Sequence, residues 1–164
     1  MADEQNTAGE QKNPVFEIIR IYNKDISLET PNSPEVFRAE WKPESKIDLD
    51  IRSNEVDKEN HVFDITLRLT VTTKIAEDKV AFLCEVNQAA LVHIENLQDQ
   101  QLGHALNATV PSILFPYARE NISSLVSKAG FPPFILQPLN FDAIYMQRLQ
   151  QEAQAAQEAP KATE

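Results

Sequence analysis

PSILFPYARENISSLVSKAG, residues 111–130, is the stretch around which the rest of the chain is organised. Pro116 suits the first helical turn, where the missing N–H is not needed, and Gly130 suits the position just past the end. Apolar residues recur at steps of three and four and so line one helix face: Leu114, Ala118, Ile122, Leu125 and Val126. The stretch therefore predicts one helix of about four turns.

An apolar stripe this wide has to pack against another surface. One interpretation is that the helix covers the sheet of its own domain. The other is that the helix is sandwiched between subunits. The stripe itself fits both arrangements, so the choice between them depends on the rest of the chain.

Composition limits the function classes. The 164 residues fit one domain, and a formal net charge of −10 argues against nucleic acid and for basic partners. A single cysteine suggests a reducing compartment. No secretory signal and no run of ~20 apolar residues is evident, so we expect a cytoplasmic protein that does not insert into a membrane. Three glycines leave no dinucleotide fingerprint and no Walker phosphate loop.

Four segments before the helix predict strands. Residues 15–29 are rich in β-branched and aromatic types, with Tyr22, Ile26 and Leu28 on one face and Asp25, Ser27 and Glu29 on the other. Residues 47–51 and 61–73 alternate polar and apolar side chains. Residues 80–94 carry apolar side chains on both faces, which predicts a strand covered on one side and partly masked on the other. The clearest alternation places five apolar residues on one face: Phe63, Ile65, Leu67, Leu69 and Val71. The connections at 53–60 and 74–79 are short and charged, as in antiparallel meanders.

The remaining segments complete an α+β pattern. The proline-rich loop 30–46 is long enough to be functional, residues 99–110 predict a short helix, and prolines keep 131–139 extended. Asn140 caps a last helix with an apolar stripe: Phe141, Ile144, Tyr145, Met146 and Leu149. We therefore predict a disordered segment 1–13, one domain over 14–150 and a polar flexible tail 151–164, helical to about residue 156. Strands followed by helices favour one antiparallel sheet with helices on one side.

No constellation of catalytic residues is evident. The three histidines do not fall at metal-ligand spacings. Cys84 lies mid-strand between Phe82 and Val86, which favours a buried small hydrophobe over a nucleophile. Asp48 and Asp50 share the polar phase of a strand, which favours solvated edge positions over paired catalytic carboxylates. We expect no enzyme activity, no metal and no cofactor.

Binding remains, and two surfaces are candidates. Asp25, Glu29 and Glu85, with Leu83 in phase, could form a flat acidic patch with an apolar centre that meets a basic partner; the alternative is that each is a solvated strand position. Aromatic residues of the 30–46 loop and the last helix could line a groove for extended apolar chain: Phe37, Trp41, Phe141 and Tyr145. The alternative for this second set is an internal core.

With these stretches described, the chain resembles SecB, the bacterial protein-export chaperone family. The resemblance spans residues 16–146, and FLCEV and LFPYARE at this order and separation are specific. Five blocks carry it: RIYNKDISLETPN (20–32), FRAEWKPE (37–44), AFLCEV (81–86), ILFPYARE (113–120) and PLNFDAI (138–144).

The resemblance implies a fold and a function. It implies a four-stranded antiparallel sheet with two main helices, assembled as a homotetramer, a dimer of dimers whose long helices are sandwiched between the sheets of two dimers. It implies a holdase that keeps unfolded precursor proteins export-competent without ATP and delivers them to the translocation motor SecA. A SecB-like chaperone for a non-export client, such as a toxin–antitoxin pair, and a small-ligand or enzymatic α+β domain are the alternatives.

The resemblance also implies roles for individual residues. The SecA-facing surface corresponds to Asp25, Glu29, Leu83 and Glu85, and subunit assembly to Cys84, Val86 and Gln88, with the long helix contributing Leu114, Ile122 and Leu125. The client groove corresponds to Phe37, Trp41, Ile47, Leu49, Phe141, Tyr145 and Leu149. Two departures bear on packing at the subunit interface: Ala89-Ala90 stand where the family often has a glycine pair, and the family's cysteine near position 105 is missing.

Overall fold

The computed structural model describes residues 12–158. Most of the predicted disordered segment 1–13 and the end of the predicted tail 151–164 lie outside the described residues. Among the described helices, none is long and apolar enough to cross a membrane.

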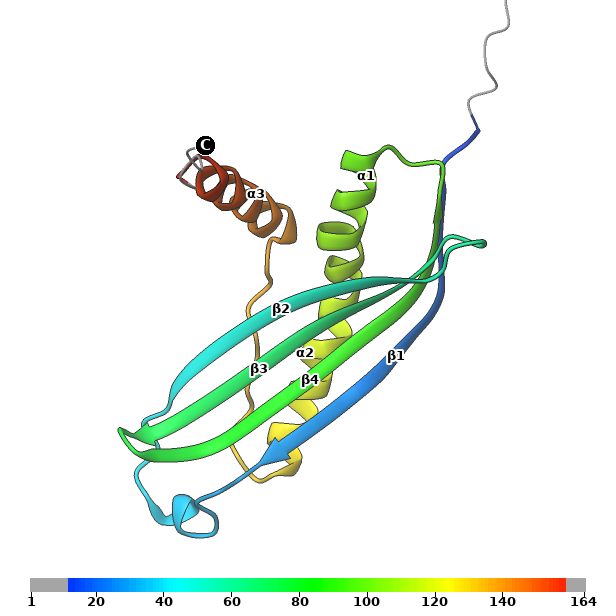
Figure 1. The fold of residues 1–164 in the computed structure, drawn as a ribbon. Helices are drawn as coiled ribbons and strands as arrows, with labels where there is room; N and C mark the ends of the chain where they lie inside the picture. Colours follow the sequence, from blue (N-terminus) through cyan, green and yellow to red (C-terminus); the bar gives the residue numbers. More distant parts are fainter. Residues whose placement is uncertain (1–11, 159–164) are drawn as a thin grey trace, which may run out of the picture.

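Four antiparallel strands form one sheet in the order β1-β4-β3-β2 (Figure 1). They are β1 (Val15–Glu29), β2 (Glu44–Asp57), β3 (Val62–Ala76) and β4 (Lys79–Glu95). This confirms the predicted α+β class and the bounds of β1. The prediction for residues 53–60 was wrong for its first half, because β2 continues to Asp57 and pairs there with Val62. Residues 53–57 lie on an edge strand and have exposed polar side chains, so they show no apolar alternation. Their backbone still pairs with β3.

A nearly continuous helix follows the sheet. It comprises α1 (Asp99–His104), a π-helical turn η2 (Ala105–Thr109) and α2 (Val110–Lys128). The predicted short helix is present as α1, and η2 joins it to α2. The placement of Pro116 in a first turn was wrong: Pro116 lies inside α2, and Pro111 occupies the first turn. Pro111 would crowd the carbonyl four residues earlier in an α-helix, and that residue, Asn107, lies in η2, where the wider turn leaves room.

Gly130 ends α2 as predicted, with a φ of 92°. Its N–H donates to the Ser127 carbonyl at 3.1 Å, and the Phe131 N–H donates to the Val126 carbonyl at 3.3 Å. These two bonds form a Schellman motif, which turns the chain back under the sheet.

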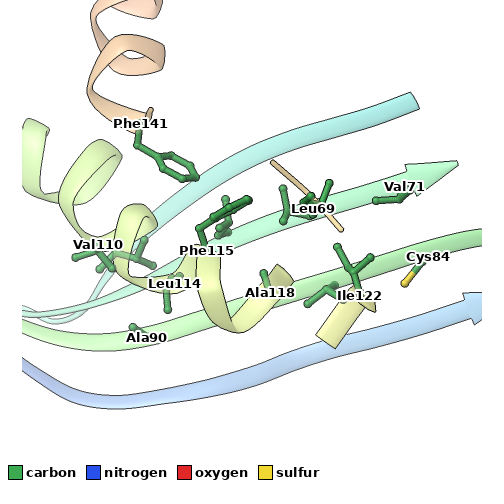
Figure 2. Packing of buried hydrophobic residues seen from close by; sticks show 14 of the residues in the cluster. Leu69, Val71, Cys84, Ala90, Val110, Leu114, Phe115, Ala118, Ile122 and Phe141 are labelled. Carbon is green, nitrogen blue, oxygen red and sulfur yellow. The ribbon is translucent and has the colours of Figure 1, made fainter. Parts of the chain in front are cut away.

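The stripe on α2 packs against the sheet of its own chain, as the first interpretation states. Buried side chains recur along it at every fourth position: Val110, Leu114, Ala118, Ile122 and Val126. They meet the apolar phases of β3 and β4, which include Leu69, Val71 and Ala90 (Figure 2). The five predicted core residues of β3 are all buried. A contact between α2 and another subunit stays a prediction.

The last helix stands away from the sheet. An extended segment, residues 131–140, runs behind the sheet on the same side as α2 and leads to α3 (Phe141–Glu158) (Figure 1). The Asn140 side chain accepts a hydrogen bond from the Ala143 N–H at 3.0 Å, which confirms the predicted N-cap. The front of the sheet in Figure 1 carries no helix, so the described chain has one covered and one open sheet face.

Candidate interaction surfaces

The four predicted acidic-patch residues lie together on the open face of the sheet, which we call the outer face. Residues that pair across antiparallel strands share a face, and Glu29 pairs with Leu83 while Ser27 pairs with Glu85. Asp25 pairs with Asn87, two positions further along β4 and therefore on the same face. We call Asp25, Glu29, Leu83 and Glu85 the acidic patch.

Arginine interrupts this patch, which sequence reasoning missed. Arg68 of β3 stands in the same cross-strand row as Asp25, and its Nη2 lies 3.0 Å from Oε2 of Glu85. Asp48 and Asp50 of β2 extend the carboxylates across the outer face. Both side chains are about half-exposed, and Asp48 pairs with Lys46 while Asp50 pairs with Arg52. They are therefore solvated strand positions, as predicted. The sequence did place Arg68 among the polar residues of β3, on the face opposite the apolar ones. That alternation was the signal that could have identified it.

A β-bulge changes the face of one predicted residue. The register of β1 and β4 shifts between Asn23 and Asp25, so Tyr22 lies on the outer face and not beside Ile26 and Leu28 as predicted. There the Tyr22 hydroxyl donates to Oδ1 of the buried Asp64 at 2.6 Å, and Lys24 forms an ion pair with the same carboxylate. The hydrogen bond to Asp64 raises the pKa of Lys24, and burial raises the pKa of Tyr22.

The predicted aromatic groove is divided into two clusters. Phe37, in the 3-10 turn η1 (Glu35–Arg38), and Trp41 pack around Phe131, with ring centroids 5.0 and 5.7 Å away. Phe131 is buried, and its ring centroid also lies 5.1 Å from that of Phe82. Sequence reasoning treated residues 131–139 only as an extended crossing and so missed Phe131. Phe37 remains half-exposed at the rim of this cluster.

The second cluster lies at the base of α3. Phe141 is 2% exposed and points toward Phe115, with ring centroids 5.8 Å apart (Figure 2). It therefore anchors α3 in the core, as the alternative of an internal core states, and does not line an open groove. Nε2 of His104 in α1 also lies 2.6 Å from Oδ1 of Asp142. These contacts hold the first turn of α3 against the preceding helices.

Apolar side chains remain exposed on β2 and on α3. Ile47 and Leu49 pair with buried residues of β3 and so lie on the α2 side of the sheet. Leu49 and Ile51 share a depression of about 150 Å³ with Ile144 and Tyr145 of α3. On the same two elements, Ile47, Met146 and Leu149 are 45%, 55% and 40% exposed. We call Ile47, Leu49, Tyr145, Met146 and Leu149 the apolar face.

The predicted assembly residues lie on α2 and on the strand β4 beneath it. Cys84, Val86, Leu114 and Ile122 are fully buried in the core of this chain. Gln88 is 2% exposed; its Nε2 donates to the Tyr22 carbonyl at 3.1 Å, and its Oε1 accepts from Asn121 at 2.9 Å. Gln88 and Asn121 border a depression of about 440 Å³ beside α2, and Leu125 is half-buried. These residues fix where α2 lies; their role in assembly stays a prediction.

Cys84 should be chemically inert in the folded protein. Its side chain is fully buried, and burial raises the pKa of its thiol to about 11. At about pH 8 this leaves roughly two orders of magnitude less thiolate than an ordinary cysteine has. We expect iodoacetamide to leave the native protein unmodified during a period that fully alkylates the protein in denaturant, as measured by mass spectrometry. Equal rates in the two states would contradict this placement.

Within residues 12–158, no group of three or more His, Cys, Asp or Glu side chains is arranged to hold a metal ion. What the arrangement offers is contact area: a charged outer face, and an apolar face on the other side of the sheet.

Comparisons with known proteins indicate a family and support the fold. A family model, SecB (Preprotein translocase subunit SecB), matches residues 9–152. The chain is similar to the Protein-export protein SecB of Idiomarina loihiensis, with 50% identity over 163 residues that cover 96% of each chain. Its fold is similar to that of a SecB-like chaperone from Mycobacterium tuberculosis, solved in complex with a ChAD peptide from the HigA1 antitoxin. That likeness has a TM-score of 0.63 at 16% identity and covers 76% of this chain and 90% of that one.

Proposed function

The chain belongs to the SecB family of chaperones, and from that premise we propose that it is an ATP-independent holdase for protein export. In this proposal it binds unfolded precursor proteins in the bacterial cytoplasm, keeps them export-competent and delivers them to SecA. The named relative at 50% identity, a protein-export protein, supports export as the process.

The observation that carries the holdase proposal is the apolar face. Its exposed side chains come from β2 and from α3, with the depression at Leu49 and Tyr145 between them. Burial of apolar area contributes about 25 cal/mol per Å² and has no directional preference. A surface of this kind holds many different unfolded sequences loosely, because apolar contact does not require a particular sequence.

Assembly into a homotetramer, a dimer of dimers, is part of the proposal. Four copies would present four apolar faces to one long client, so weak contacts would act together through their effective concentration. The formal charge of −10 on each chain would keep such surfaces in solution. The exposed side of α2, including Tyr117, and the depression beside it offer contact area for a second chain.

The acidic patch is the proposed docking site for SecA. It lies on the outer face, whereas the apolar face lies on the α2 side of the sheet. A client and SecA could therefore be bound at the same time, which handover requires. Oppositely charged surfaces also speed the encounter of two proteins.

Light scattering of an unfolded precursor tests the holdase function. The precursor is diluted from denaturant into buffer without nucleotide. The buffer contains either no chaperone or one tetramer of the full-length protein per precursor molecule. We expect scattering to be suppressed, and a precursor that has already folded should not bind. Undiminished aggregation at stoichiometric amounts would overturn the proposal.

A further inference from the structure

The two carboxylate oxygens of Glu85 have different surroundings. Oε2 accepts hydrogen bonds from Nε of Arg68 at 3.1 Å and from the Thr70 hydroxyl at 3.0 Å. Among the described residues, the polar contact of Oε1 is the Asn87 side-chain amide at 3.5 Å, the long limit of a hydrogen bond. The Glu85 side chain retains a quarter of its exposure. One oxygen is thus held by the protein, and the other keeps its capacity to accept.

We propose that Arg68 and Thr70 are positioning residues that preset Glu85 as an acceptor for a lysine or arginine side chain of the docking partner. This inference rests on the proposed function, because the partner is the one that binds the acidic patch. A carboxylate already fixed in one rotamer loses less conformational entropy when a partner binds. Its free oxygen then forms a charge-assisted hydrogen bond, which is about twice as strong as a neutral one.

Charge alone predicts the opposite role for Arg68. A cation within an acidic patch repels a basic partner, so its removal should tighten binding. A cation that holds Glu85 in position contributes to binding, so its removal should weaken it. The sign of the change in affinity therefore separates the two roles.

Arg52 provides a matched control. It lies on the outer face of β2, pairs with Asp50 at 2.8 Å and is separated from β4 by β3. Arg68→Gln and Arg52→Gln remove the same charge from the same face, but only the first releases Glu85. Thr70→Val removes a hydroxyl donor from Glu85 without any change of charge.

The experiment is a calorimetric titration of SecA into the full-length protein and its variants. We expect Arg68→Gln to weaken binding about tenfold and Thr70→Val about threefold. Arg68→Lys should recover part of the loss, since lysine still donates to Oε2. Arg52→Gln should leave the affinity within about twofold or tighten it. Melting temperature, solution mass and aggregation suppression should stay at the wild-type values, which separates positioning from a fold defect.

Two results overturn this inference, and they differ from failure of the proposed function. If wild-type protein binds SecA and Arg68→Gln binds equally or more tightly, Arg68 acts only as a charge. If Arg68→Gln and Arg52→Gln weaken binding equally, the effect does not pass through Glu85. If wild-type protein does not bind SecA at all, the docking proposal itself fails, and this inference fails with it.

Discussion

Replacement of Ile47, Met146 and Leu149 by serine is expected to weaken binding of unfolded precursor about a hundredfold. Each side chain is about half-exposed, so a client that covers it would bury the remaining half and gain about 1 kcal/mol. Three such losses sum to about 3 kcal/mol, or roughly two orders of magnitude in affinity. Fluorescence anisotropy of a labelled, permanently unfolded precursor measures this change, and light scattering measures the loss of holding capacity.

A second variant shows whether position or only hydrophobicity matters. Ile19 and Val56 are equally exposed but lie outside the apolar face, so their replacement by serine should leave client affinity within about twofold. Because all five side chains are exposed, neither variant should change the melting temperature much. If the triple variant still held precursor at wild-type affinity, clients would bind elsewhere on the chain.

Reversal of two charges in the acidic patch, Asp25→Lys with Glu29→Lys, is expected to weaken SecA binding about a hundredfold. Each reversal replaces an attraction of about 0.5–1 kcal/mol by a repulsion of similar size. Both carboxylates lie on the outer face, and neither has the arginine contact that partly neutralises Glu85. Calorimetric titration measures the affinity, and the wild-type affinity should fall as salt is raised.

The matched control reverses two carboxylates at the other end of the sheet. Glu17 and Glu59 border the depression beside His61 and His93, so Glu17→Lys with Glu59→Lys makes the same change in net charge at a distance from the patch. This control should retain most of the SecA affinity, and both variants should still suppress aggregation.

Equal losses in the two variants would mean that net charge governs the encounter. Unchanged binding in the patch variant would place the SecA site elsewhere, and absence of binding in wild type would favour a non-export client.

The parts of the fold that sequence predicted well are those with regular alternation. Along β3, five apolar residues alternate with polar ones, and burial of one sheet face requires that pattern. Gly130 was predictable for a different reason, since few other residues adopt its φ of 92°. The shared phase of Asp25 with Glu29, and of Leu83 with Glu85, followed from alternation within each strand. The structure adds that β1 pairs with β4 and so brings the two sets onto one face.

The features that were missed depend on tertiary contacts that carry no local pattern. A register shift next to Lys24 inverts the face of Tyr22, and alternation within one strand cannot show where such a bulge occurs. The ion pair between Arg68 and Glu85 joins β3 and β4, and the register of these two strands could not be predicted from sequence. Prolines around Phe131 indicate an extended segment, but only the packed structure shows that its ring fills the space between Phe37, Trp41 and Phe82.

Methyl NMR of the full chain during titration with an unfolded precursor tests the apolar face as the client site most directly. We expect resonances of Ile47, Leu49, Met146 and Leu149 to shift or broaden at substoichiometric client, while Leu83 on the outer face stays unperturbed. Perturbation of Leu83 and its outer-face neighbours, with the methyl groups of β2 and α3 unchanged, would contradict the proposed holdase mechanism.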